Sequence, residues 1–332
     1  MNKDRVESID TLRVVAILAV VMIHTTTRVL EATQYNLSQY PWTLFLNQMS
    51  RFAVPLFFLI SGFVLEISSK HEMSYFSFLK KRFAKIFVPY LFWSLIYYYF
   101  VFTNNHDSLV RLILTGSGSY QLYFIPTLCI FYIAFPLLHK LYKYISMPVT
   151  LVTLAGLQLW LLYQDYFIKN GGADHPLRIV MMSFFVFLIG IVAARNKEKI
   201  FEFAKRYRFP IAAAATYLAY YIFKEGYNLY YKTYNVGAIY SQYRPSILLY
   251  TLLIGILFYY LVRNVNLQRF SNLSYLVFFV HVIILDSIWN LFSKFVNPNP
   301  IFDVLFFLTV SVVSFLTAFV AHKIPKLNKL TG

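Results

Sequence analysis

The chain opens with an apolar run that holds two basic side chains, Arg13 and His24: residues 9–27 read IDTLRVVAILAVVMIHTTT. A run of this length and composition is typical of a helix that spans a bilayer. Ionisable groups inside such a helix are costly, so Arg13 and His24 mark a candidate functional site. At about 100° and 1.5 Å per residue, both side chains share one helix face, roughly 16 Å apart along the axis. That face carries a fixed cation near one membrane surface and a titratable imidazole about halfway across.

The whole chain has the composition of a membrane protein. Of 332 residues, 59% are hydrophobic and only 13% are charged, and a soluble domain of this size needs more polar surface. The net charge of +16 lies between the apolar runs. We therefore attribute it to topology signals and anionic lipid, and we expect no nucleic-acid partner. The single Cys129 excludes a disulfide framework and a cysteine metal site, and no metal is predicted.

We predict an all-α, polytopic membrane helix bundle of about ten transmembrane helices. The chain is expected to be one domain, residues 1–332, with no appended soluble domain and with a retained first helix rather than a signal peptide. Most of the 30 Lys and Arg residues fall on one side of the predicted spans, which places both termini in the cytoplasm. The predicted spans are 12–30, 43–66, 86–103, 120–138, 147–167, 177–194, 209–224, 246–262, 272–292 and 301–321.

Two connecting segments have unusual compositions. Residues 68–85 hold Lys80, Arg82 and Lys85 among aromatic residues, which is typical of an amphipathic stretch at the membrane surface. That stretch is either a surface anchor or a lip that binds phosphate groups. Residues 225–245, predicted as the longest outer loop, are rich in tyrosine. Their tyrosines form either an interfacial belt or a platform on which sugar rings stack.

Three basic side chains inside the predicted spans are candidates for chemistry. A neutral His24 can take a proton from a hydroxyl, which is general-base work. Arg51, on the second span, is expected at the depth of His24, where its guanidinium could stabilise an oxyanion. The alternative for Arg51 is a structural ion pair, for which Asp286 is a candidate partner. His281, on the ninth span, either belongs to the functional site or forms a hydrogen bond between helices.

Weaker candidates for ligand-binding residues lie toward the predicted cytoplasmic side. Asp10 precedes Arg13 by one helical turn, so the pair is either a first-turn ion pair or part of a ligand site at the inner mouth. Arg13 could equally extend its charge to the membrane surface. Ser61, beside Gly62, allows either close helix packing or the close approach of a ligand.

At these residues the sequence resembles the integral-membrane acyltransferase-3 family, whose members O-acylate surface glycans. Residues 10–24 look like its opening Asp-x-x-Arg and Arg-x10-His signature. The other matching stretches are 51–63, 78–90 and 274–281. The chain departs from the family where the fourth helix opens, because Gln121 and Tyr123 stand in a motif that often begins His-Leu-Trp.

The resemblance implies transfer of an acyl group, most simply acetyl, from cytoplasmic acyl-CoA to a hydroxyl of a cell-surface glycan or its lipid-linked precursor. It implies a multi-pass protein of the bacterial plasma membrane, in contact with lipids, with acetyl-CoA as co-substrate and no permanently bound cofactor. Self-association is left open. Carried onto this chain, the catalytic residues are His24, Arg51 and Arg13. The substrate-binding residues are Asp10, Ser61, Lys80, Arg82, Lys85, Gln121, Tyr123 and His281.

Two alternatives remain open from the sequence. His24 acts either as the base in direct transfer or as a transient carrier of the acetyl group. A protein of another class, a transporter or flippase for a lipid-linked glycan, would also carry intramembrane charge. Spans broken by Gly or Pro in matching halves would favour transport, and no such pair is evident.

Overall fold

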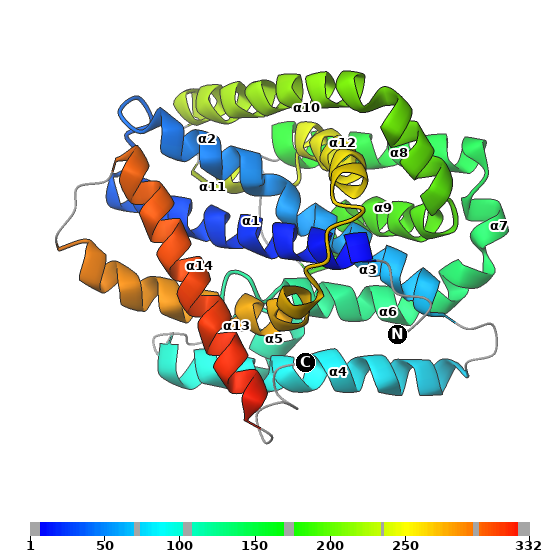
Figure 1. The fold of residues 1–332 in the computed structure, drawn as a ribbon, viewed down its shortest axis with the longest axis horizontal. Helices are drawn as coiled ribbons and strands as arrows, with labels where there is room; N and C mark the ends of the chain where they lie inside the picture. Colours follow the sequence, from blue (N-terminus) through cyan, green and yellow to red (C-terminus); the bar gives the residue numbers. More distant parts are fainter. Residues whose placement is uncertain are drawn as a thin grey trace.

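A computed structural model describes residues 7–69, 74–101, 108–168, 176–233, 236–294 and 299–324. Every regular element in these ranges is helical (Figure 1). The α-helices are α1 (Glu7–Ala32), α2 (Pro41–Met49), α3 (Ala53–Ser68), α4 (Tyr75–Ile96), α5 (Leu109–Thr115), α6 (Phe124–Lys140), α7 (Tyr142–Ile145), α8 (Pro148–Tyr163), α9 (Pro176–Arg195), α10 (Lys197–Thr233), α11 (Val236–Tyr240), α12 (Pro245–Leu261), α13 (Gln268–Phe292) and α14 (Pro300–Lys323). A 3-10 turn (Ser50–Phe52) joins α2 to α3, and π-helical turns extend α4 (Tyr97–Val101) and α8 (Gln164–Ile168).

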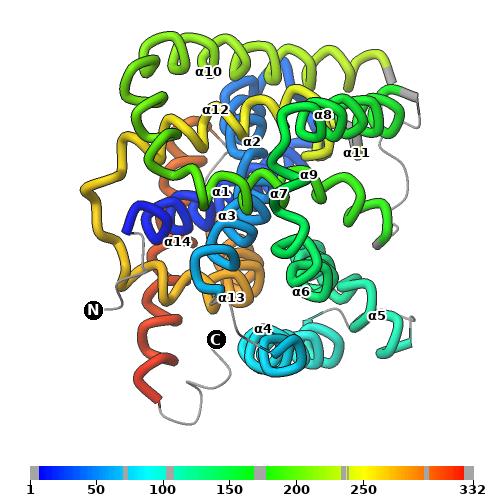
Figure 2. The backbone as a smooth tube through the Cα atoms, turned by 90° about the vertical axis from the view of Figure 1, so that its right-hand side faces the viewer, coloured from blue at the N-terminus to red at the C-terminus, as the bar shows by residue number. Residues whose placement is uncertain are grey.

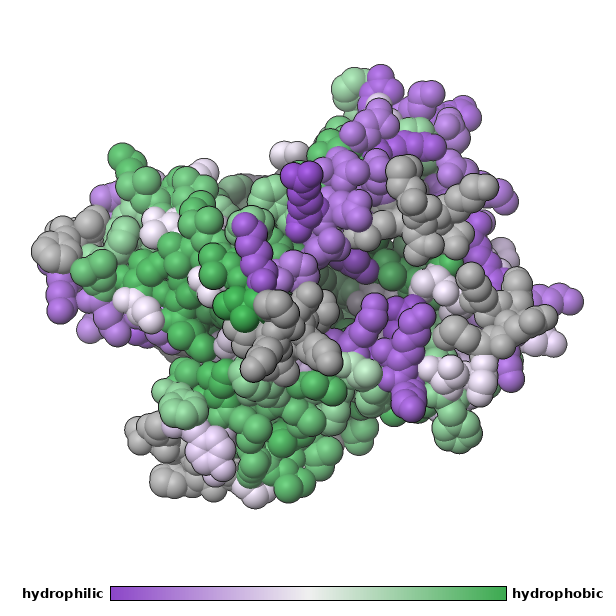
Figure 3. All heavy atoms as spheres, turned by 60° about the horizontal axis from the view of Figure 1, so that its bottom comes forward, coloured by the Kyte–Doolittle hydropathy of each residue, from purple (hydrophilic) through white to green (hydrophobic). Residues whose placement is uncertain are grey.

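The helices are those of a membrane protein. Six helical segments among the described residues are long and apolar enough to cross a bilayer: 7–32, 41–68, 75–101, 177–195, 268–292 and 300–323. Broad apolar areas cover much of the face shown in Figure 3, and hydrophilic residues gather mainly toward one end of it. Each predicted span falls largely on helical residues, although residues 102–103 of the third lie outside the described residues. Ten crossings with both termini in the cytoplasm stay a prediction.

α1 occupies the middle of the bundle. It packs against α2, α3, α12, α13 and α14. In Figures 1 and 2, α10 runs along one side of the molecule and α4 along the opposite side, with α1 between them. Several α1 side chains that lie inside the bundle are small or β-branched. Ala16, Ile17 and Val21 are fully buried. This central position makes α1 a wall of the site described below.

The closest helix contact joins α3 to α9 through two glycines. A Cβ on Gly62 would lie 2.2 Å from the Phe187 carbonyl oxygen, and one on Gly190 would lie 2.0 Å from the Leu59 carbonyl oxygen. Small residues let helix backbones approach closely where no hydrophobic effect drives association. Gly62 thus serves close packing, and a ligand role for the neighbouring Ser61 stays a prediction.

Three predicted boundaries were wrong in extent. The third span begins at Tyr75, because residues 75–85 contain no helix breaker and their basic side chains face outward. The seventh lies within the longer α10, which departs from helical geometry at Tyr207, shortly before Pro210. The predicted outer loop 225–245 is largely helical, since α10 continues to Thr233 and α11 follows.

The second span is interrupted where its charged residue lies. Arg51 sits in the 3-10 turn Ser50–Phe52 between α2 and α3. Pro55 has no N–H to donate to the carbonyl of the residue four positions earlier, which is Arg51, so the regular α-helical pattern is lost there. The turn aims the Arg51 side chain into the bundle, where it is 4% exposed.

Candidate functional site

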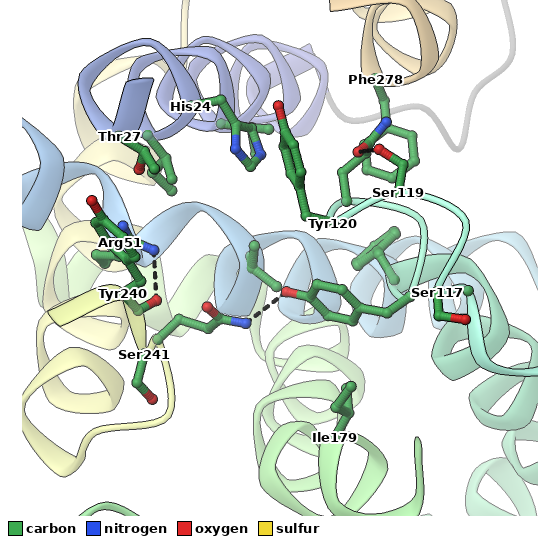
Figure 4. A pocket seen from close by; sticks show the side chains of 18 of the residues that line it. His24, Thr27, Arg51, Ser117, Ser119, Tyr120, Ile179, Tyr240, Ser241 and Phe278 are labelled. Atoms are coloured by element: carbon green, nitrogen blue, oxygen red, sulfur yellow. Dashed lines mark hydrogen bonds between the residues drawn. The ribbon is translucent and has the colours of Figure 1, made fainter. Parts of the chain in front are cut away.

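A cavity of about 820 Å³ lies where α1, the 3-10 turn, the segment between α5 and α6, and the segment after α10 meet. Figure 4 shows His24 and Thr27 on α1 facing Arg51 and Tyr240 across this space. Four residues predicted for the site line the cavity: His24, Arg51, Gln121 and Tyr123. Residues separated by more than two hundred positions in the chain thus meet at one site.

His24 projects from the middle of α1 against two other rings. Its ring centroid lies 4.6 Å from that of Tyr120 and 5.2 Å from that of His281. Tyr120 stands upright beside His24 in Figure 4 and comes from the turn before α6. The imidazole therefore contacts two aromatic neighbours, while the histidine still borders the cavity.

Arg51 is held by neutral acceptors. Its Nε and Nη2 donate to Asn47 Oδ1 (3.1 and 2.7 Å), and its Nη1 donates to the Tyr240 carbonyl oxygen (2.6 Å). A guanidinium has more N–H groups than these bonds use, so an N–H on Nη1 and another on Nη2 remain. No ion pair among the described residues involves Arg51. The structure thus excludes Asp286 as its ion-pair partner.

The ring of Tyr240 also contacts Arg51. The guanidinium carbon lies 5.0 Å from the ring centroid. Burial raises the pKa of the Tyr240 phenol, so the ring stays neutral at physiological pH and offers a π face rather than a phenolate. The positive charge of Arg51 is therefore positioned without being cancelled.

Asn47 connects the two candidate catalytic residues and was missed by sequence reasoning. Besides accepting from Arg51, its amide nitrogen lies 3.1 Å from the Ile23 carbonyl oxygen and 3.0 Å from each of the Thr26 and Thr27 hydroxyls. These groups belong to the turn of α1 that carries His24. The available signal was the spacing, because Asn47 stands one helical turn before Arg51.

Gln121 and Tyr123 are committed to hydrogen bonds in the cavity wall. Gln121 accepts from the Ser119 hydroxyl (2.5 Å) and donates to the Tyr97 hydroxyl (3.0 Å). Tyr97, in the π-helical turn, in turn donates to the Phe279 carbonyl oxygen (2.6 Å) on α13. The Tyr123 hydroxyl accepts from the Gln242 amide (2.6 Å). These bonds tie the segment after α5 to α4, α13 and the segment after α11.

The rim of the cavity carries mixed charge. Arg28, Glu31 and Asp286 line one part of it, with Arg28 and Glu31 3.9 Å apart. Arg178 lines another part and forms a two-point ion pair with Asp165, in the second π-helical turn. Together with the tyrosines and amides of the wall, this rim offers both hydrogen-bond donors and acceptors to a polar ligand.

Asp10 and Arg13, which were predicted to form a ligand site at the cytoplasmic end of α1, do not line the cavity. Arg13 is 3.4 Å from Asp10, and Asp10 also accepts from the Ser271 hydroxyl at 2.8 Å. Asp10 therefore ties α1 to the start of α13, and neither residue of the pair is among those that line the cavity. The predicted passage from Arg13 to His24 stays a prediction.

The remaining predicted residues are also outside the cavity lining. Lys80 and Lys85 are exposed on α4, while Arg82 donates to the Ser68 hydroxyl (2.5 Å) and lies over the Phe78 ring. The Ser61 hydroxyl donates to the Phe57 carbonyl oxygen within its own helix (2.8 Å). The fifth such residue, His281, is fully buried behind the cavity wall and does not border the cavity itself.

A sequence model of the acyltransferase-3 family, described as an "Acyltransferase domain", matches residues 6–322. The chain belongs to this family. Similar curated proteins come from Staphylococcus aureus strains MSSA476 and MRSA252. Each is named "Probable poly-beta-1,6-N-acetyl-D-glucosamine export protein". Each is 23% identical to this chain, over 319 and 321 residues respectively, covering 91% of the chain and 88% of the relative. No solved structure matches the chain.

Family membership confirms the resemblance on which the motif comparison rested. In this acyltransferase the motif residues divide into two groups. His24, Arg51, Gln121 and Tyr123 surround one cavity, whereas Arg13 and Asp10 lie on α1 about three and four turns away from His24. One cavity of this membrane acyltransferase thus holds a candidate base, His24, and a cation, Arg51, that has no ion-pair partner among the described residues. These are groups that ester formation requires.

Proposed function

We propose that the protein is an O-acyltransferase of the bacterial plasma membrane that moves an acetyl group from cytoplasmic acetyl-CoA to a hydroxyl of a cell-surface glycan or its lipid-linked precursor. The observation that carries the proposal is the meeting of His24 and Arg51 in one cavity. Family membership supports acyl transfer, and the long apolar helices support a site within the membrane.

The chemistry assigned to the two residues is complementary. The His24 imidazole takes the proton of the acceptor hydroxyl as its oxygen attacks the thioester carbonyl. The remaining N–H groups of Arg51 stabilise the oxyanion that forms on that carbonyl. Collapse of the intermediate expels the CoA thiolate, which takes the proton from His24. The route through an acetyl-His24 intermediate uses the same residues and stays the alternative.

The rim supports a carbohydrate as the acceptor. Tyr240 and Tyr243 line the cavity with aromatic surface, and Gln242, Glu31 and Asp286 bring amide and carboxylate groups. Sugar rings stack on aromatic faces through their C–H groups and bond amides and carboxylates through their hydroxyls. The names of the staphylococcal relatives, which concern a polysaccharide, point to the same class of acceptor.

The donor is assigned to the opposite side of the membrane. Arg13 on α1 and the exposed Lys80 and Lys85 on α4 form the basic groups that we assign to the phosphates of acetyl-CoA. From there the pantetheine arm would run along α1, whose Arg13 and His24 lie about 16 Å apart along the axis.

The test compares two histidine variants in the native host. His24→Ala should abolish O-acetyl esters on the surface glycan, measured by mass spectrometry. His322→Ala should leave them unchanged, because His322 is exposed at the end of α14. Both variants should reach the membrane in wild-type amounts. Wild-type ester content in a well-expressed His24→Ala strain would overturn the proposal.

The relatives' printed names favour export as a second candidate function. A transporter moves the glycan across the membrane without changing it covalently. Deletion of the gene would then lower the amount of glycan at the surface and leave the ester content of the remaining glycan unchanged. The acyltransferase predicts the reverse, with loss of esters and unchanged export.

A further inference from the structure

His281 lies directly behind the wall of the cavity. Phe278 and Leu285, about one turn before and one turn after it on α13, both line the cavity. His281 itself is fully buried. α13 packs against α1 here, and the rings of His281 and His24 lie 5.2 Å apart between centroids, with their planes inclined by 34°.

The hydrogen bond of His281 to its own helix sets its tautomer. Nδ1 lies 3.0 Å from the Val277 carbonyl oxygen, which only accepts, so Nδ1 carries the proton and donates. A neutral imidazole then has a lone pair at Nε2. That nitrogen is buried and has no hydrogen-bond partner among the described residues. A buried, unpaired acceptor costs on the order of 1–3 kcal/mol and calls for an explanation.

We propose that His281 is a positioning residue whose unpaired Nε2 accepts the ring N–H of His24. This inference rests on the function proposed above. The bond holds His24 in the tautomer whose other nitrogen faces the cavity as an acceptor for the substrate proton. It forms as the His24 ring turns when substrates bind, since catalytic hydrogen bonds tighten in the complex.

In this reaction His24 alone accepts and releases a proton. The acceptor hydroxyl gives its proton to the cavity-facing nitrogen of His24, which becomes an imidazolium. The opposite N–H stays bonded to His281 Nε2 throughout, and its hydrogen bond shortens as the charge forms. The cavity-facing proton then passes to the CoA thiolate, so the ester and free CoA thiol are the only products. His281 neither gains nor loses a proton.

A neutral acceptor suits this place in the protein. An aspartate behind His24 would hold the imidazole equally well, but it would add a buried negative charge within a membrane-spanning bundle, which is costly. It would also lie near Arg51, which lines the same cavity as His24, and reduce the positive field there. A histidine whose N–H is occupied by Val277 supplies the acceptor without the charge.

Two amide variants separate the role of Nε2 from packing. The side-chain amide of asparagine reaches the place of Nδ1, so His281→Asn keeps the bond to Val277 and removes the acceptor that faces His24. The longer side chain of glutamine brings an amide oxygen to the place of Nε2. Native-membrane vesicles, which contain the natural acceptor, are supplied with acetyl-CoA, and CoA release gives kcat and KM for each variant.

The two variants should differ in kcat and agree in KM. His281→Asn should lower kcat by about 10²-fold, the usual contribution of a well-placed acid–base group. His281→Gln should stay within about fivefold of the wild type, since it restores the acceptor. Equal kcat values for both variants would overturn the inference. If His281→Asn fails to accumulate in the membrane, the glutamine variant decides alone, and a loss of about 10²-fold there overturns it.

The outcome is separate from that of the proposed function. Inactive His24→Ala with fully active His281→Asn would refute only the role of His281. Active His24→Ala would refute the acyl-transfer mechanism itself, whatever the His281 variants do.

Discussion

At the scale of single residues, the site is organised around a guanidinium that no carboxylate of the described residues neutralises. Arg51 bonds only to the Asn47 amide oxygen and the Tyr240 carbonyl oxygen among the described residues. Asn47 also contacts the turn of α1 that carries His24. A single amide therefore fixes Arg51 relative to the turn of α1 that carries His24, the proposed base, and it brings no negative charge to Arg51.

Changing this amide to a carboxylate tests whether the free charge matters. We expect Asn47→Asp to keep Arg51 in place and to lower kcat by about 10²-fold, because a fixed anion cancels the field at the oxyanion. The same variant loses the amide donor to Ile23 and should lose about 1–3 kcal/mol of stability. CoA release by membrane vesicles and thermal unfolding in detergent measure the two effects.

The control for this charge change is Asn36→Asp. Asn36 is exposed in the segment between α1 and α2, so the variant adds the same charge outside the cavity. It should leave both measurements unchanged. Wild-type kcat in Asn47→Asp would show that catalysis does not depend on the uncompensated charge of Arg51.

At the scale of elements, irregular turns and close contacts place the site. The 3-10 turn at Ser50–Phe52 interrupts the second span at Arg51, and the π-helical turns hold Tyr97 and Asp165 at positions that support the cavity wall. Behind these elements, α3 and α9 approach backbone to backbone at Gly62 and Gly190. The site therefore depends on helix geometry as much as on helix sequence.

The glycine contact should be intolerant of even a methyl group. In Gly190→Ala the new Cβ would meet the Leu59 carbonyl oxygen, and backbone cannot rotate away as a side chain can. We expect a loss of about 1–3 kcal/mol, seen as a lower melting temperature in detergent. Gly156→Ala in α8 is the matched control, because no atom lies within 4 Å of its Cβ position. It should unfold at the wild-type temperature or slightly above. Equal melting temperatures for both variants would contradict the close α3–α9 contact.

At the scale of the whole molecule, the cavity and the Asp10–Arg13 pair lie toward opposite ends of α1. His24, Arg28 and Glu31 lie in its second half and line the cavity, whereas Asp10 and Arg13 lie in its first turns. With the predicted orientation, the cavity faces the cell exterior and Arg13 faces the cytoplasm. Donor and acceptor would then approach the same helix from opposite sides of the membrane.

Cysteine labelling tests this orientation. The native Cys129 is buried, so single introduced cysteines report with little background. Ser38→Cys, exposed between α1 and α2, should react with a membrane-impermeant maleimide on intact cells. Asn264→Cys, exposed between α12 and α13, should react only after the cells are permeabilised. The opposite pattern would reverse the predicted topology.

The sequence predicted the positions of the helices well and the residues of the site in part. Apolar runs placed a helix at every predicted span, because run length and composition report directly on burial in lipid. His24 and Arg51 were found because charge inside such runs is costly. Asn47 and Tyr120 were missed, because burying one polar or aromatic side chain near a helix end costs too little to mark it in the sequence. Tyr240 was considered only as one of the tyrosines of residues 225–245, and its contact with Arg51 was not predicted. The basic segment after residue 74 was misjudged as a loop, because basic residues are compatible with a helix at the membrane surface.

The sequence by itself determined the membrane class, the family and four residues that line the cavity, because hydropathy and motif spacing are local properties of the chain. Only the tertiary structure decided what surrounds them. The bond of Arg51 to Tyr240, the contacts of Asn47 with α1, the burial of His281 behind His24, and the exclusion of Asp286 from Arg51 all depend on contacts between distant segments. Such contacts are set by the packing of side chains from distant segments, and no spacing within one helix encodes them.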